Sequence, residues 1–107
     1  MPERYDVASL EPRELQPGHR GRFIHSEHTT HVYWEIEAGA VLPAHSHPHE
    51  QIVNMLEGTY ELVVDGESYV LNAGDVLVIP GGAVHGGGAQ TDCRILDVFS
   101  PVREEYR

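Results

Sequence analysis

The sequence contains no lysine and only one cysteine, and both shortages narrow the range of functions. Its seven strongly basic side chains are all arginines, scattered among 17 acidic residues, so the formal net charge is −10 with the histidines neutral. Binding to nucleic acid or to an anionic membrane needs clustered basic side chains, and we expect neither partner. The lone Cys93 cannot form an internal disulfide, which favours a reducing, cytoplasmic location.

Long hydrophobic runs are absent as well. No apolar stretch approaches the roughly 20 residues that a membrane-spanning helix needs. The N-terminal segment MPERYDVASLEPREL lacks the apolar centre of a secretory signal peptide. The length of 107 residues suits one domain with its own hydrophobic core. We interpret Cys93, in the strand-like segment TDCRILDVFS, as a small buried hydrophobic residue rather than a nucleophile.

What the sequence does contain is a series of short β-rich segments separated by turn residues. No segment keeps the 3.6-residue period of an amphipathic helix, and glycine, proline and Asp-Gly interrupt segments rich in valine, isoleucine and tyrosine. Strands are predicted at residues 21–26, 30–37, 51–56, 59–65, 67–71, 75–79 and 93–100. This pattern predicts an all-β sandwich or barrel. We assign residues 1–19 to an N-terminal arm with at most one short strand and residues 20–107 to the barrel.

Three histidines lie close together in the segment PAHSHPHEQ, and they are candidates for metal ligands. His45 and His47 are two residues apart in an extended segment, which sends both side chains to the same face. After a bend at Pro48, Gln51 opens the next strand, and two imidazoles beside a side-chain oxygen can coordinate a first-row metal. His85, which follows a Pro-Gly-Gly turn, is the candidate fourth ligand. The alternative is a polar, solvated turn.

The other histidines are weaker candidates for coordination. His49 lies in the turn between the two strands, where we expect contact with the ligands or with solvent. The remaining histidines have no ligand spacing, and we expect them at the surface or lining the barrel: His19, His25, His28 and His31.

Two spaced motifs connect these residues to a known family. Residues 39–58 match G-x5-H-x-H-x3-E-x6-G, except that Gln51 replaces the glutamate. Residues 74–85 match G-x5-P-x-G-x2-H, although Ala89 replaces the asparagine that follows this second motif. The pair resembles the cupin superfamily, which implies a small antiparallel jelly-roll barrel with a metal site inside. The resemblance assigns the metal ligands to His45, His47, Gln51 and His85.

Replacement of the glutamate by Gln51 bears on the chemistry of the site. Three neutral imidazoles and a neutral amide leave the charge of a divalent ion uncompensated, which strengthens its Lewis acidity and supports higher oxidation states less well. Open coordination positions then serve substrate oxygens. We therefore expect polarisation of a substrate oxygen rather than dioxygen chemistry, with nickel, zinc, iron or manganese as the ion. Glu50 can replace Gln51 only through a register shift, because neighbouring strand residues face opposite ways.

The C-terminal segment ILDVFSPVREEYR contains a second group of candidates. Asp97 and Phe99 share one face of the last predicted strand, where a carboxylate is costly unless it is paired or functional. One interpretation is an Asp97–Arg103 ion pair that stabilises the last strand. The other assigns a general acid/base to Asp97, an aromatic platform to Phe99 and a carboxylate clamp to Arg103.

The combination of HSHPHEQ with L-D-x-F-S-P-x-R-E resembles a narrower group, the small single-domain cupins of pectin and alginate breakdown. Those proteins convert 4,5-unsaturated monouronates to linear ketones. The resemblance implies an acidic sugar as substrate and catalytic roles for Asp97, Phe99 and Arg103. Two alternatives stay open: another metal-dependent cupin enzyme, such as a dioxygenase or an isomerase acting on a small acid, and a cupin that binds a small molecule without turnover. The three-histidine pattern disfavours a storage role.

Two further expectations concern the walls and the exterior of the barrel. Strand parity does not decide which aromatic residues face inward among Tyr33, Trp34, Tyr60 and Tyr69. If Gln51 faces the interior, then Ile52, Asn54 and Leu56 face outward, and that face is more apolar than a solvated surface. We therefore expect a homodimer with twofold symmetry.

Overall fold

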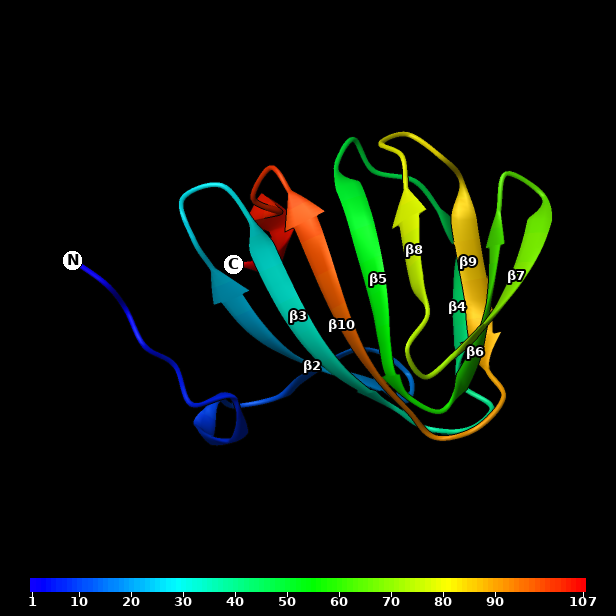
Figure 1. The fold of residues 1–107 in the computed structure, drawn as a ribbon, viewed down its shortest axis with the longest axis horizontal. Helices are drawn as coiled ribbons and strands as arrows, with labels where there is room; N and C mark the ends of the chain where they lie inside the picture. Colours follow the sequence, from blue (N-terminus) through cyan, green and yellow to red (C-terminus); the bar gives the residue numbers. More distant parts are fainter.

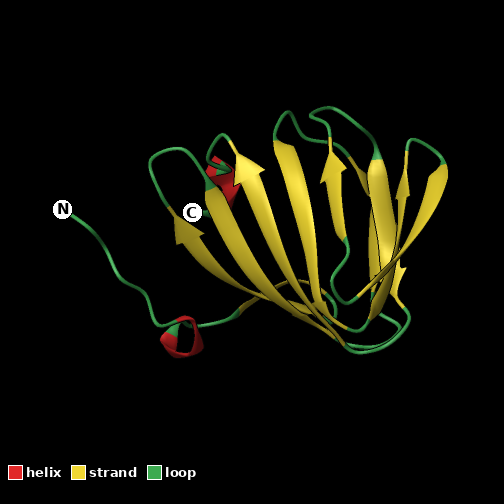
Figure 2. Cartoon of the chain, viewed as in Figure 1, coloured by secondary structure: helices red, strands yellow, loops and turns green.

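The computed structural model describes all 107 residues, and ten antiparallel strands account for more than half of the chain (Figure 2). The strands are β1 Arg13–Gln16, β2 His19–His25, β3 Thr30–Ile36, β4 Val41–His45, β5 Glu50–Glu57, β6 Thr59–Val64, β7 Glu67–Asn72, β8 Val76–Ile79, β9 His85–Ala89 and β10 Cys93–Ser100. The helical segments are two single 3-10 turns, η1 Val7–Ser9 and η2 Glu104–Tyr106. No helix has the length and apolar character that crossing a membrane requires. Each of the seven predicted strands is present, within two residues of its expected ends.

Two sheets face each other and form the walls of the barrel (Figure 1). The larger sheet has the strand order β1-β2-β3-β10-β5-β8, and the smaller sheet has the order β4-β9-β6-β7. Strand β10 pairs with both β3 and β5, so the last strand of the chain lies in the middle of the larger sheet. This two-sheet jelly roll confirms the predicted all-β cupin fold.

Alternation along the strands determines which side chains reach the interior. In β3, Val32, Trp34 and Ile36 are buried, whereas their neighbours in sequence are only half-buried. In β5, Gln51 is buried and Leu56 is exposed, as the predicted register of that strand requires. The inward faces of the two sheets together form a continuous core of 14 buried residues.

The turn between β8 and β9 lies against the loop that contains His47. The backbone N–H of Gly82 donates to the carbonyl of His47 at 2.8 Å, and Gly82 adopts a φ of +85°, in the left-handed region that glycine tolerates. At Gly81, a side-chain Cβ would lie 2.2 Å from the carbonyl oxygen of Pro48. These two glycines therefore let the two histidine-bearing segments approach each other closely.

Residues 1–19 contain one strand, β1, which pairs with the beginning of β2 at the edge of the larger sheet. The segment before η1 extends away from the barrel (Figure 1). Strand β2 begins at His19, the last residue that we assigned to the arm.

Candidate functional site

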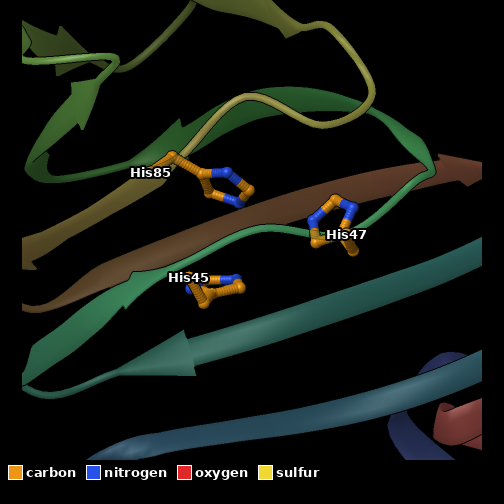
Figure 3. Close-up of side chains that lie close together, drawn as sticks. All are labelled: His45, His47 and His85. Carbon is orange, nitrogen blue, oxygen red and sulfur yellow. The ribbon is translucent and has the colours of Figure 1, made fainter.

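Three histidines from two strands and one loop face a common space (Figure 3). His45 is the last residue of β4 and His85 is the first residue of β9, and the pairing of these strands sets the two residues opposite each other. His47 lies in the bend that follows β4. One ring nitrogen from each histidine lies within 4.8 Å of the other two.

The position of His47 differs from the prediction that it shares a strand face with His45. Strand β4 ends at His45, and the register of its pairing with β9 is irregular between Leu42 and His45. Pro48 lacks a backbone N–H and cannot continue the ladder, so the chain bends before β5. His47 approaches the other two rings from this bend instead of from a strand.

Each of the three rings contacts a backbone carbonyl through its Nδ1 atom. The distances are 2.9 Å from His45 to the Pro43 oxygen, 3.0 Å from His47 to the His49 oxygen and 2.9 Å from His85 to the Ala83 oxygen. A carbonyl oxygen only accepts hydrogen bonds, so Nδ1 carries the proton in each neutral ring and Nε2 keeps its lone pair. This is the tautomer in which histidine coordinates a metal through Nε2.

Gln51 adds an oxygen atom to this cluster. Its Oε1 lies 3.1 Å from His47 Nε2, and both atoms are acceptors when Nδ1 of His47 is protonated. His85 Nε2 is buried and has no hydrogen-bond partner. Several lone pairs that converge in a buried space without a donor are stabilised by a cation. Three imidazole nitrogens and an amide oxygen therefore fit a first-row divalent metal.

The electrostatic surroundings keep the imidazoles available for coordination. Burial lowers the pKa of His47 to about 4, and the charge of Arg103 acts in the same direction. Burial also lowers the pKa of His85, although its contact with the Ala83 carbonyl opposes this shift. Both rings are therefore neutral at pH 7, the form that binds metal.

We expected His49 to contact either the metal ligands or solvent. It is buried, with 8% of its surface exposed, so the expectation of solvent contact is wrong. The centre of its ring lies 5.5 Å from that of His47, and its carbonyl accepts the Nδ1 proton of His47. His49 thus contacts a candidate ligand through its backbone.

A cavity of about 320 Å³ connects the histidine cluster to the C-terminal candidates. Six of the seven residues that the sequence singled out line it: His45, Gln51, His85, Asp97, Phe99 and Arg103. The seventh, His47, is not among the lining residues, and its ring centre lies 5.5 Å from that of Phe99. Apart from these groups, the lining is mostly apolar.

Asp97 is a buried carboxyl group on the inward face of β10. Its Oδ2 accepts a hydrogen bond from Trp34 Nε1 at 3.0 Å, whereas its Oδ1 is buried without a partner. Burial raises the pKa of Asp97 to about 7, although Gln51, Trp34 and Arg103 favour the charged form. Loss of hydration therefore outweighs all three. A carboxyl group with this pKa can gain and lose a proton near neutral pH.

Arg103 does not form the ion pair with Asp97 that one interpretation of the sequence expected. Its Nε donates to Glu105 Oε1 at 2.6 Å, and its Nη1 donates to the Tyr106 hydroxyl at 2.7 Å. The chain turns into η2 directly after Arg103, which supplies both partners locally. The guanidinium also lies 5.0 Å from the centre of the Phe99 ring, at the cavity wall.

The structure also resolves the aromatic residues that strand parity left open. Trp34 and Tyr60 line the cavity, whereas Tyr33 and Tyr69 do not. His19 is buried and lines the cavity too, one of the two positions that we expected for it. Tyr106 also lines the cavity, but it was not identified as a site residue from the sequence. Its only signal in the sequence is its position three residues after Arg103, in a segment that forms one helical turn.

The comparison with protein-family models agrees with this geometry: the model described as "Cupin domain" matches residues 32–99. The chain belongs to the cupin family. The matched region runs from within β3 to within β10 and contains His45, His47, Gln51 and His85.

Among curated proteins, this cupin is similar to the pectin degradation protein KdgF of Dickeya dadantii (strain 3937). The two sequences are 33% identical over 70 residues, which is 64% of this chain and 64% of that protein. The match thus spans just under two thirds of the length of that relative.

Two solved structures resemble the whole cupin chain. KdgF from Halomonas sp. superposes with a TM-score of 0.93 at 27% identity, and the match covers all of both chains. An RmlC-like cupin from Shewanella frigidimarina superposes with a TM-score of 0.90 at 28% identity, covering 96% of this chain and 94% of that one.

Proposed function

We propose that this cupin is a metal-dependent enzyme that converts 4,5-unsaturated monouronates to their linear ketone forms. The observation that carries this proposal is the buried Asp97, which lines the same cavity as two of the histidines and whose Oδ1 has no hydrogen-bond partner. The similarity to a pectin degradation protein supports an acidic sugar from pectin as the substrate.

The proposed reaction is an isomerisation in which atoms and electrons balance without an oxidant. The hemiacetal hydroxyl at C1 loses its proton, the bond between C1 and the ring oxygen breaks, and an aldehyde forms at C1. The oxygen released on C5 belongs to an enolate, which takes a proton at C4 and becomes the ketone. The two proton transfers call for one group that titrates near neutral pH, and Asp97 has this property.

The residues around Asp97 suit an acidic, ring-shaped ligand. Arg103 presents a guanidinium at the cavity wall, and a guanidinium can donate two hydrogen bonds to a carboxylate. Phe99 offers an apolar face to the ring. Trp34 donates to Asp97 Oδ2, which leaves Oδ1 as the atom that exchanges a proton with the substrate.

The metal ligands in this proposal are His45, His47, Gln51 and His85. A bound nickel, zinc, iron or manganese ion would stabilise negative charge that develops on a substrate oxygen. Gln51 oxygen faces the His47 ring, and its side chain also favours the charged form of Asp97. Gln51 therefore connects the ligand cluster with the proposed acid/base.

The experiment that tests this function follows the ultraviolet absorbance of the conjugated double bond in freshly prepared 4,5-unsaturated galacturonate. Metal-loaded protein is expected to remove the absorbance faster than a protein-free control, under air and without oxygen alike. Loss only in the presence of oxygen would favour the dioxygenase alternative. Loss no faster than the control, together with saturable binding of the sugar, would favour a binding protein without turnover.

We further propose that the enzyme acts in the cytoplasm as a homodimer. The single cysteine, Cys93, is buried and unpaired, which suits a reducing compartment. The outer faces of the neighbouring strands β5 and β8 carry exposed apolar side chains, among them Leu56, Val76 and Val78. Association of two such faces would remove this apolar surface from water.

A further inference from the structure

The cavity has a polar region, made by His19 and Tyr60, that lies outside the ligand cluster and has no part in the chemistry described above. Tyr60 comes from β6 in the smaller sheet and His19 from β2 in the larger sheet, and both side chains line the cavity. The Tyr60 hydroxyl lies 3.1 Å from His19 Nε2. This hydrogen bond therefore joins the two sheets across the interior.

The direction of this hydrogen bond follows from the second contact of His19. His19 Nδ1 lies 3.3 Å from the carbonyl oxygen of Pro17, which can only accept. The Nδ1 atom therefore carries the proton, Nε2 accepts, and the Tyr60 hydroxyl donates to it. Burial lowers the pKa of His19 and raises the pKa of Tyr60, so both groups are neutral at pH 7 and this direction is maintained.

A phenol whose O–H donates a hydrogen bond to His19 has only oxygen lone pairs left for a ligand. Asp97 lines the same cavity, and in its charged form it supplies a second acceptor, because its buried Oδ1 has no hydrogen-bond partner. Much of the surrounding wall is apolar, with Trp34, Leu62 and Ile95 among the lining residues. The part of the cavity beside Tyr60 thus offers an acceptor to a ligand hydroxyl, whereas the guanidinium of Arg103, on the wall of the same cavity, is a donor suited to a carboxylate.

We infer that Tyr60, oriented by His19, is a specificity-determining residue that accepts a hydrogen bond from a hydroxyl group of the ligand. A ligand that carries hydroxyls satisfies a buried acceptor that an apolar ring would leave unpaired. The site therefore selects hydroxylated acids over acids of the same ring size without hydroxyls. This inference rests on the proposed function for the class of ligand, and it adds the residue that recognises the hydroxyl.

The test uses two unreactive ring acids, so that binding is measured without turnover. D-galacturonate carries hydroxyls, and tetrahydropyran-2-carboxylate has a similar ring and carboxylate without them. Calorimetric titration of metal-loaded wild-type protein is compared with Tyr60→Phe. The substitution is expected to weaken galacturonate binding about tenfold and to leave tetrahydropyran-2-carboxylate binding within about twofold.

Two further variants separate recognition from a purely structural role. Tyr69→Phe removes a hydroxyl outside the cavity, which donates to Glu67, and it should bind both acids as the wild type does. His19→Leu removes the acceptor that orients Tyr60, and it should reduce the preference for galacturonate while the protein remains folded by circular dichroism. If His19→Leu does not fold, Tyr60→Phe alone decides the inference.

The outcomes distinguish this inference from the proposed function. If wild type and Tyr60→Phe do not differ in galacturonate binding, whether both bind it or neither does, the inference is overturned. Equal weakening of both acids in Tyr60→Phe also overturns it, because that result describes a distorted cavity. A hydroxyl-specific effect in a protein that leaves the unsaturated uronate unchanged would support Tyr60 as a recognition residue and reject the proposed reaction.

Discussion

The histidine cluster and Asp97 share one cavity, but contacts of very different range along the chain orient them. Each histidine ring is held by a carbonyl two residues away, as in the contact of His45 with Pro43. Asp97 instead accepts from Trp34, 63 residues earlier, across the pairing of β10 with β3. The orientation of each histidine ring therefore depends on local backbone conformation, whereas the protonation of Asp97 depends on the assembled barrel.

The largest effect is expected from removal of a histidine that the local backbone orients. In His85→Ala, the cluster loses one of its three imidazoles, and metal affinity should fall by more than about 100-fold. This loss exceeds the effect of removing a residue that only hydrogen-bonds to a metal ligand. Metal content after dialysis is measured by mass spectrometry, with the exposed His28→Ala as the matched control. Equal metal content in the two variants would show that the cluster is not the metal site.

The second-largest effect is expected from substitution of Asp97, which tests whether Asp97 and the histidine cluster act separately. Asp97→Asn keeps an acceptor for Trp34 but cannot take up a proton, so turnover of the unsaturated uronate should fall by about 100- to 10,000-fold. Bound metal should remain at the wild-type level, because Asp97 is outside the proposed ligand set. Full activity in this variant would remove Asp97 from the mechanism, and loss of metal would show that the two groups are one unit.

A smaller effect is expected in the pH dependence of stability. Burial raises the pKa of Asp97 in the folded protein to about 7, above the value in an unfolded chain, so the folded state binds this proton more tightly. The resulting stabilisation is present at low pH and disappears as the pH rises through about 7. In metal-free protein, the melting temperature of wild type should therefore fall relative to Asp97→Asn between pH 5 and pH 9.

Comparing wild type with Asp97→Asn also cancels the contribution of the histidines to the pH dependence of stability, which has the opposite sign. The pKa of His47 is lowered in the folded protein, so its stabilisation is present at high pH and is lost as the pH falls. This contribution occurs in both proteins and drops out of the difference. A melting-temperature difference that stays constant from pH 5 to pH 9 would contradict the raised pKa of Asp97.

The histidine rings are oriented by local contacts and Asp97 by a long-range contact, and this difference also explains how much of the site could be predicted from the sequence. The histidine positions follow from short motifs because their spacing and their turns are local, and the strands followed from turn residues and alternation. The sequence showed the bend at Pro48, but local spacing did not show that β4 ends at His45, where its pairing with β9 is irregular.

Long-range features were the least predictable part. Parity predicted that Asp97 and Phe99 share one strand face, but the partner of Asp97, Trp34, is fixed by the register of β10 against β3. The Asp97–Arg103 pair, one of the two interpretations of this segment, does not form because η2 supplies Glu105 and Tyr106 as partners for Arg103. Side chains that are brought together by the pairing of distant strands have no characteristic spacing in the sequence from which their contact could be predicted.

The smallest effect on activity is expected outside the cavity, on the outer face of the larger sheet. Val76 and Val78 of β8 are 59% and 55% exposed and lie beside β5. Val78→Asp should convert the proposed dimer to a monomer in analytical ultracentrifugation, with turnover within about twofold, because one chain forms the whole cavity. Val70→Asp, which changes an exposed valine on the other sheet, is the control. A wild-type monomer, or an unchanged dimer in Val78→Asp, would reject this interface.

The most direct test of the account is the stereochemistry of proton delivery to C4 of the unsaturated uronate. The reaction is run in deuterium oxide, stopped early, and the product is examined by nuclear magnetic resonance. If Asp97 delivers the proton from one side of the cavity, wild-type protein places deuterium on a single face of C4. Equal deuterium on both faces, at the rate of the protein-free control, would contradict the proposal that this cavity catalyses the reaction.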